Sequence, residues 1–296
     1  MLGEGTFYRS KKRYEVRIHK KLLAEDFKRL YGVQRQTHKE MVETIKKAEK
    51  QKGKGGVRAK LSLEDQVLVA LQYWREYRAY FHIGNDWGIS ESTVCRIVQK
   101  VENILIKSEK FRLEGKKSLW AANAPAKVAV DVTESQIERP KHHQKGFYSG
   151  KKKYHTLKCQ LVVEINTFKI ICTAFGKGAE HDFHLFKACG VHFSKNTQSF
   201  ADKGYQGLQK LHVNSQIPIK KPKGGELSKE NKRFNRVLSR QRIVIEHVNR
   251  RLKIFKILSE PYRNRHRRFG LRCNLLAAIC NFELELKASA NQAKLQ

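Results

Sequence analysis

Ser199-Phe200-Ala201-Asp202-Lys203-Gly204-Tyr205-Gln206-Gly207 predicts a short buried strand, then a carboxylate, then a turn that contains glycine and an aromatic ring. Open α/β architectures place their chemistry where strands end, at the rim of a sheet. We therefore expect Asp202 at such a rim. One carboxylate does not define a reaction, so the nature of the site depends on the other acidic residues of the chain.

Two further acids occupy comparable positions. An apolar, β-branched run that begins at Lys127 closes on Asp131, which predicts a second aspartate at a strand end. Glu246 lies within a strongly basic amphipathic helix that we expect over about residues 238–258. The polar face of this helix holds Arg242, Glu246, Asn249 or Arg250, and Lys253. Two strand-end aspartates and a helix glutamate are able to hold a pair of divalent cations, which predicts a phosphoryl-transfer site.

Each candidate has a simpler interpretation. Glu246 alone would be read as the partner of Arg242 in a surface ion pair one turn away. Glu134 would point away from Asp131 if the strand continued, which favours a loop or supporting role. Asp182, between two histidines, suggests a metal site, but an acid in the first turn of a helix is the favoured interpretation. His142 and His143 lie in a basic loop and are read as phosphate contacts or solvated residues rather than ligands.

The charge balance points to a polyanionic partner. The 296 residues include 61 Lys and Arg against 28 Asp and Glu, a formal net charge of +33. Membrane binding is the weaker alternative, because no run of 18 apolar residues exists and the N-terminus lacks a signal-peptide core. We expect a cytosolic protein. The six cysteines contain no Cys-x-x-Cys pair and lie mostly in apolar runs, which indicates reduced core residues rather than a disulfide framework or zinc site.

The segment 57–110 predicts a helix-turn-helix domain. A capping box at Ser62 opens one helix, a second short helix spans about 77–86, and Gly88 and Ser90 form the turn before a third helix. This last helix has one apolar stripe, which leaves four polar residues exposed: Ser92, Arg96, Gln99 and Lys100. Polar residues near the start of such a helix enter a DNA major groove. The alternative is a plain three-helix bundle.

The remaining boundaries follow from composition. Residues 1–56 predict two basic helices around a break at Gly32 and a flexible linker, with either an accessory role or a role in DNA binding or dimerisation. Residues 111–126 are read as a connector, 127–286 as the catalytic domain and 287–296 as a tail. Within 127–286 we expect three strands in a meander, a helix from His181, a strand at Asp202, an edge strand at 217–222, and the acid-bearing helix. This order predicts an α+β, multi-domain chain whose mixed sheet is ribonuclease-H-like.

At this point the chain resembles a DDE transposase of bacterial insertion sequences, in the branch similar to Harbinger-type elements. The resemblance runs from Leu61 to about Phe282. Its specific parts are Asp131-Val-Thr-Glu134, Gly150-Lys-Lys with His155-Thr-x-Lys158, Asp202-Lys-Gly-Tyr205, Lys220-Lys-Pro222, and Arg242-x3-Glu246-x6-Lys253. The family signature begins with a tyrosine where this chain has Ser239. Any role of that tyrosine ring in the family, in stacking or phosphate contact, therefore does not carry over to this chain.

The resemblance implies a catalytic triad of Asp131, Asp202 and Glu246 that binds two divalent cations, Mg²⁺ with Mn²⁺ able to substitute. It implies that water and then a 3′-OH attack DNA, and that the partners are terminal inverted repeats and target DNA, bound by a homodimer or larger assembly near the bacterial nucleoid. The DNA-binding residues expected are Ser92, Arg96, Gln99, Lys100, Lys151, Lys152, Arg242, Arg250 and Lys253. Two other functions stay open: a helix-turn-helix DNA-binding protein without catalysis, and a stand-alone metal-dependent nuclease.

Overall fold

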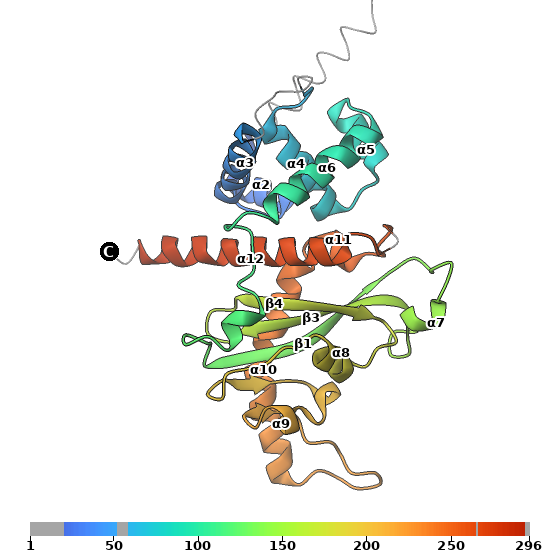
Figure 1. Cartoon of the computed structure of the whole chain (residues 1–296), viewed down its shortest axis with the longest axis vertical. Helices are drawn as coiled ribbons and strands as arrows, with labels where there is room; N and C mark the ends of the chain where they lie inside the picture. The colour runs from blue at the N-terminus through green and yellow to red at the C-terminus, as the bar shows by residue number, and fades with distance from the viewer. Residues whose placement is uncertain (1–20, 52–58, 265, 294–296) are drawn as a thin grey trace, which may run out of the picture. The chain divides into compact units, whose positions relative to one another are not determined.

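The computed structural model describes residues 21–51, 59–264 and 266–293. The chain divides into two compact units (Figure 1). The first unit comprises residues up to Arg112 together with Ile254–Ile257 and the segment from Glu285, and the second comprises Leu113–Lys253 and Leu258–Leu284. Most of the predicted linker, residues 52–56, lies outside the described residues, as do residues 1–20 of the predicted N-terminal region.

The first unit is helical, as the sequence predicts. Its helices are α2 (Ala24–Tyr31), α3 (Arg35–Lys50), α4 (Leu63–Glu76), α5 (Tyr80–Trp87) and α6 (Glu91–Leu105). Gly32 ends α2 with a φ of 78°, a left-handed conformation that glycine adopts without a steric cost.

The caps of the helix-turn-helix fix its boundaries. The Ser62 hydroxyl accepts a hydrogen bond from the Asp65 amide, and the Ser90 hydroxyl accepts one from the Thr93 amide. Gly88 ends α5 in the left-handed conformation. Between the helices, the buried indole of Trp74 donates to Glu102 at 3.1 Å. The predicted helix-turn-helix is therefore confirmed in its elements and its caps.

The second unit is built on a mixed sheet. Its strands are β1 (Lys127–Gln136), β2 (Tyr148–Ser149), β3 (Tyr154–Glu164), β4 (Ile170–Lys177), β5 (Gln198–Phe200) and β6 (Ser215–Gln216). β3 lies between β4 and β1 and is antiparallel to both, whereas β5 is parallel to β1 and β6 is parallel to β5. The order β4-β3-β1-β5-β6 is the one expected of a ribonuclease-H-like sheet, and the α+β class is confirmed.

The second unit also contains helices. They are η1 (Lys116–Leu119), α7 (Gln144–Phe147), α8 (Asp182–Ala188), η2 (Lys203–Tyr205), α9 (Leu208–Leu211) and α10 (Lys229–Leu252). The last two helices, α11 (Lys256–Ser259) and α12 (Phe269–Gln292), are each divided between the two units. α10 packs against β1, β3 and β5. The apolar core beside the sheet includes Val128 and Val130 of β1, Val162 of β3, and Tyr205. Because β1 and the turn after β5 pack into the same core, their positions relative to each other are fixed.

Three sequence predictions are corrected. β1 does not end at Asp131, because its pairing with β3 continues to Gln136. Residues 217–222 form no strand: the Asn235 side chain of α10 binds both the amide and the carbonyl of Ile219, and so takes the groups that a sheet edge would use. α10 begins at Lys229 rather than near 238, since Ser228 caps it by accepting from the Asn231 amide.

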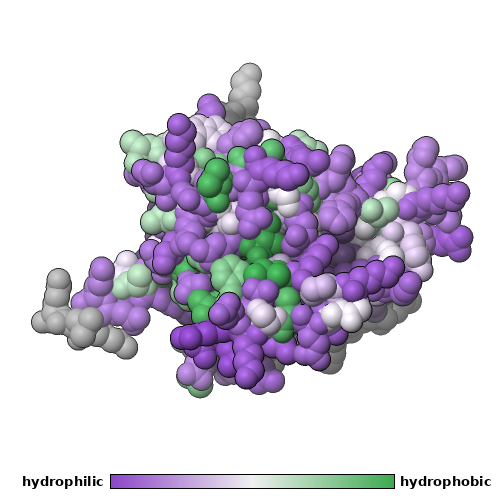
Figure 2. All heavy atoms as spheres, turned by 90° about the horizontal axis from the view of Figure 1, so that it is seen from below, coloured by the Kyte–Doolittle hydropathy of each residue, from purple (hydrophilic) through white to green (hydrophobic). Residues whose placement is uncertain are grey.

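The cysteines are unpaired, and most of them are buried. All six cysteines are free thiols, and Cys159, Cys172, Cys273 and Cys280 are buried. Among the described residues, no helix combines the length and the apolar character needed to cross a membrane. Hydrophilic side chains cover most of the face in Figure 2, as the net charge requires, and hydrophobic atoms gather in a strip near its middle.

Candidate active site

Strand register places Asp131 and Asp202 side by side. β1 and β5 run parallel, and Ala129 is the partner of Phe200 in the last paired rung. Asp131 and Asp202 each follow that rung by two residues, so their side chains return to the same face. Asp131 is thus not at the end of its own strand but at the level where its neighbour β5 ends. Asp202 follows the end of a strand, as the sequence predicts, whereas Asp131 does not.

The two carboxylates interact electrostatically. Burial, and after it the nearby charge of Asp202, raises the pKa of Asp131 to about 6, while Arg242 acts in the opposite direction. Asp202 accepts a hydrogen bond from the Gly204 amide at 2.7 Å, which turns its carboxylate toward its own loop. A carboxyl group whose ionisation is disfavoured by burial and by a neighbouring acid is typical of sites that receive cations.

Asp182 is a third acid in the same place. It occupies the first turn of α8, as its favoured interpretation predicts, and it also raises the pKa of Asp131. A side-chain carbon at Gly204 would stand 2.9 Å from Asp202 Oδ1 and 3.1 Å from Asp182 Oδ2, so the glycine allows both carboxylates to approach. Lys158 of β3 holds Asp182, with Nζ 2.8 Å from Oδ1, and also donates to the Glu180 carbonyl.

One face of α10 supplies the polar groups opposite these acids. Arg242, Glu246, Asn249 and Lys253 are spaced by four, three and four residues, which places them in one stripe along the helix. Asn249 Nδ2 donates to Asp131 Oδ2 at 3.3 Å. Burial lowers the pKa of Lys253, the positive charge of Lys152 lowers it further, and Asp131 raises it. Lys152 and Lys253 therefore lie near each other at the acidic site.

Glu246 lies in the stripe but does not touch the aspartates. Its side chain is exposed, and the part of the chain that the structure describes contains no ion pair between Glu246 and Arg242. The simpler interpretation, a surface ion pair, is therefore not what the structure shows. The described residues also contain no group of three or more His, Cys, Asp or Glu side chains arranged to hold a metal ion. The structure brings Asp131 and Asp202 together and leaves Glu246 on the facing helix.

The donor set nevertheless fits a hard divalent cation. Asp131 and Asp202 offer carboxylate oxygens, the ligands that Mg²⁺ and Mn²⁺ prefer. Asn249 Oδ1 and Arg242 Nε are buried beside them without a hydrogen-bond partner. Such unmade hydrogen bonds are uncommon in native proteins, and they mark a place where a further polar partner would be stabilised.

The other predicted residues fall into two groups. Ser92, Arg96 and Gln99 are exposed on α6, and Lys151, Lys152 and Arg250 are exposed in the second unit. Lys100, in contrast, is held within the first unit by Glu49 at 2.8 Å and by Gln66 at 3.2 Å. Glu134 accepts a hydrogen bond from Thr156 at 2.8 Å, in agreement with a supporting role.

Sequence reasoning missed the pair of Lys158 and Asp182. The motif His155-Thr-x-Lys158 was visible, but its partner depended on the register of β3 and the position of α8. Tyr205 was visible as an aromatic residue next to Asp202, but not as a buried phenol that donates to Gln160 at 3.2 Å. Burial and the neighbouring carboxylates raise the pKa of Tyr205, so it stays protonated.

Two families and one curated protein match the chain. A family described as DDE superfamily endonuclease matches residues 130–281, and one described as helix-turn-helix of DDE superfamily endonuclease matches residues 59–111. The chain is 61% identical over 270 residues to a protein of Microchaete diplosiphon named "Probable transposase for insertion sequence element IS702"; the match covers 91% of this chain and 98% of that protein. No solved structure matches the chain.

Proposed function

The chain belongs to the DDE superfamily endonucleases and is an insertion-sequence transposase with a helix-turn-helix domain, and we propose that Asp131, Asp202 and Glu246 perform its phosphoryl transfer. Endonucleases of this superfamily depend on divalent metal ions. The observation that carries the assignment is the register of β1 and β5, which sets two aspartates side by side beneath the polar stripe of α10.

The metal is Mg²⁺ in this proposal, with two ions per site and Mn²⁺ able to replace them. When bound, such ions activate the attacking oxygen and stabilise the leaving oxygen of an in-line displacement. Asp131 and Asp202 would hold them from the sheet. Glu246 would complete the set once its exposed side chain turns toward Asp131, and Asn249, one turn further on, would keep the Asp131 carboxylate oriented.

The cations around the acids would position DNA. Arg242 and Lys253 lie on the same stripe as Glu246, and Lys152 lies close to Lys253. In this proposal they bind phosphates on either side of the bond that breaks, while Lys151 and Arg250 extend the basic surface. In this proposal water attacks first and frees a 3′-OH at the element's end, and that 3′-OH then attacks target DNA.

The helix-turn-helix would select the element's terminal inverted repeats. Ser92, Arg96 and Gln99 face solvent on the helix that enters the major groove in this motif. Because Lys100 is already engaged by Glu49, we assign it a supporting rather than a reading role. We further propose that the protein acts as a homodimer or larger assembly on DNA in the bacterial cytosol.

Replacement of Asp202 by Asn tests the catalytic assignment. Asn keeps the shape but loses the charge that offsets the cations, so Mg²⁺-dependent cleavage of element-end DNA should fall by several orders of magnitude. Gel-shift affinity without metal should stay equal or rise slightly, because one charge that repels phosphate has gone. Glu230→Gln is the matched control, since Glu230 is an exposed acid in the first turn of α10. Cleavage retained by Asp202→Asn would remove Asp202 from the site.

A further inference from the structure

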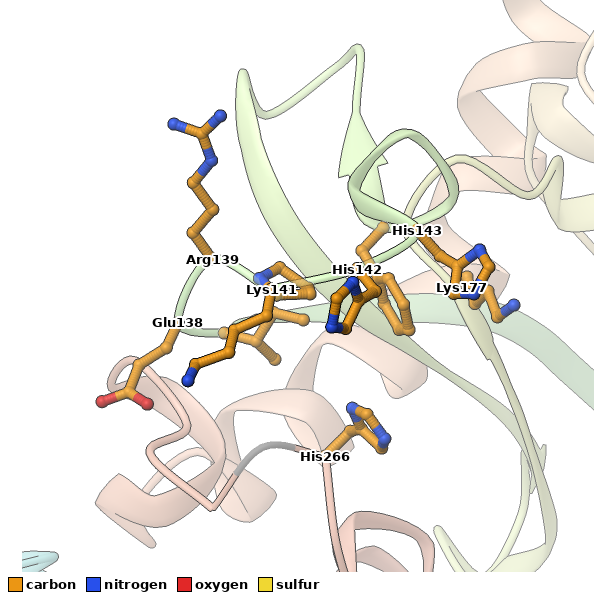
Figure 3. A pocket seen from close by; sticks show the side chains of 10 residues that line it. Glu138, Arg139, Lys141, His142, His143, Lys177 and His266 are labelled. Atoms are coloured by element: carbon orange, nitrogen blue, oxygen red, sulfur yellow. The ribbon is translucent and has the colours of Figure 1, made fainter.

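A cavity of about 680 Å³ lies in the second unit, and neither Asp131, Asp182 nor Asp202 lines it. It is lined by the loop that follows β1, by Phe147 of α7, by Lys177 at the end of β4, and by His266 before α12 (Figure 3). Pockets that bind small molecules or single nucleotides span roughly 300–1,000 Å³. Its size is therefore that of a binding pocket, and the assigned reaction uses none of these residues.

Aromatic surfaces form one side of the pocket. Phe147 is buried, and the ring of His266 stacks on it nearly parallel, with centroids 5.7 Å apart and planes 14° apart. Lys177 Nζ lies 5.4 Å from the centre of the Phe147 ring. Figure 3 shows His142 and His266 on opposite sides of the open space. A flat group could enter between these two exposed rings.

The charge of the pocket is positive. Its lining holds Arg139, Lys141 and Lys177 against a single acid, Glu138. In Figure 3 Glu138 and Arg139 point away from the two histidines, and Arg139 donates to Gln144 at 2.9 Å. Lys141 remains beside the open space. The pocket thus combines ring faces with cations, which is the composition of sites that bind single-stranded nucleic acid.

Backbone conformation also marks the pocket. His143 and His266 have φ angles of 54° and 55°, in the left-handed region that few residues other than glycine adopt, although histidine does so more often than most. Strained residues of this kind collect at ligand sites, where the surrounding structure holds them. Both histidines line the cavity.

We propose that this pocket binds an unpaired nucleotide of the DNA substrate, with its base between His142 and His266 and its phosphate on Lys141. The assignment rests on the transposase function proposed above. β1 connects the two sites, since it runs from Asp131 toward Ile137 at the pocket. Six residues of strand span about 20 Å. At about 3.4 Å per stacked nucleotide, the bound base lies within roughly six nucleotides of the phosphate under attack.

The test compares two DNA probes without metal, so that it does not depend on catalysis. One probe is a blunt duplex and the other is the same duplex with a single-stranded overhang of six nucleotides, and fluorescence anisotropy gives Kd for the full chain at fixed salt. The wild-type protein should bind the overhang probe more tightly. His266→Ala should remove this preference, a loss of about tenfold, because stacking of one base is worth that much or more. Its affinity for the blunt probe should not change.

Two further variants separate stacking from folding and charge. His266→Tyr keeps a flat ring and should keep the preference, and His142→Ala removes the opposite ring and should lose it. His192→Ala is the matched control: His192 is an exposed histidine of the same unit that also lies against an aromatic ring, Trp120, but outside the pocket. It should behave as wild type.

Three results would overturn the proposal. They are equal binding of both probes by the wild-type protein, an equal loss on both probes in His266→Ala, and full preference retained in both His266→Ala and His142→Ala. An equal loss would reduce His266 to a contact with duplex phosphate. None of these results bears on Asp131, Asp202 or Glu246, whose failure would appear in metal-dependent cleavage instead.

Discussion

At the scale of single residues, Asp131 makes the stability of the metal-free protein depend on pH. Its folded-state pKa of about 6 lies above its ordinary value of 3.8, so the folded state binds the proton more tightly. The associated stability is fully present below about pH 4 and is lost as the pH rises through 6. The loss amounts to about 3 kcal/mol. Replacement of Asp131 by Asn removes this titrating group, so the stability of the variant should depend less on pH than that of the wild type.

Thermal melts of wild type and Asp131→Asn at pH 4.5 and pH 7, in the presence of chelator, measure this difference. The wild type should lose stability relative to the variant between the two pH values. If the stability of the two proteins changed equally between these pH values, the pKa of Asp131 would not be raised in the folded state.

Lys158 stabilises the cluster by compensating Asp182. Lys158 is nearly buried, and Lys158→Met would leave the Asp182 carboxylate beside two other acids without its partner. We expect a loss of about 3 kcal/mol in the free energy of unfolding, measured with urea. The double variant Lys158→Met with Asp182→Asn should recover most of it. A loss below about 1 kcal/mol in the single variant would place Asp182 in a more solvated environment than the structure indicates.

At the scale of elements, the helix-turn-helix carries a prediction about specificity. Arg96 is exposed on α6, and its hydrogen bonds to the described residues are local: it donates to the Ser92 carbonyl and the Thr93 hydroxyl. Arg96→Ala should weaken binding to the element's end by about 1 to 3 kcal/mol if the guanidinium contacts a base. Lys39→Ala, which removes an exposed cation from α3, is the control for charge alone. Equal losses on random DNA in gel-shift assays would make Arg96 a phosphate contact.

Helices and their caps could be predicted from the sequence because their signals are local. Ser62, Ser90, Gly32 and Gly88 each act within a few residues, and the predicted helices begin and end beside them. Strand lengths depend on partners that are distant in the chain. β1 continues past Asp131 because β3 offers nine consecutive partners, which no property of β1 itself reveals.

In the candidate site, too, local features were predictable from the sequence and contacts between distant segments were not. The residue types and the spacing on α10 were predictable from the sequence, since a helical stripe follows from its period. The adjacency of Asp131 and Asp202 required the parallel register of β1 and β5, and the third acid required the position of α8. The pattern of its own helix predicted that Lys100 is exposed, but it could not reveal the ion pair with Glu49, which lies on another helix.

At the scale of the whole molecule, the proposed self-association has a candidate surface. The N-terminal part of α10 exposes Phe234 and Val237, which are 39% and 53% accessible and one turn apart. Val237→Glu should reduce the assembled fraction on element-end DNA, as measured by light scattering after gel filtration, and should leave the fold intact. Arg240→Glu, a charge change one turn further on the same helix, is the comparison. Unchanged assembly in Val237→Glu would exclude this surface as the interface.

We expect Glu246 to join Asp131 and Asp202 around divalent ions when DNA is bound. The most direct measurement is anomalous diffraction from crystals of the full chain with element-end DNA and Mn²⁺. We expect two ions between Asp131 and Asp202, about 3.5 to 4 Å apart. A carboxylate oxygen of Glu246 should lie within about 2.2 Å of one of them. Ions held by Asp182 in place of Glu246, or a Glu246 side chain that still faces solvent in that complex, would exclude Glu246 from the catalytic triad.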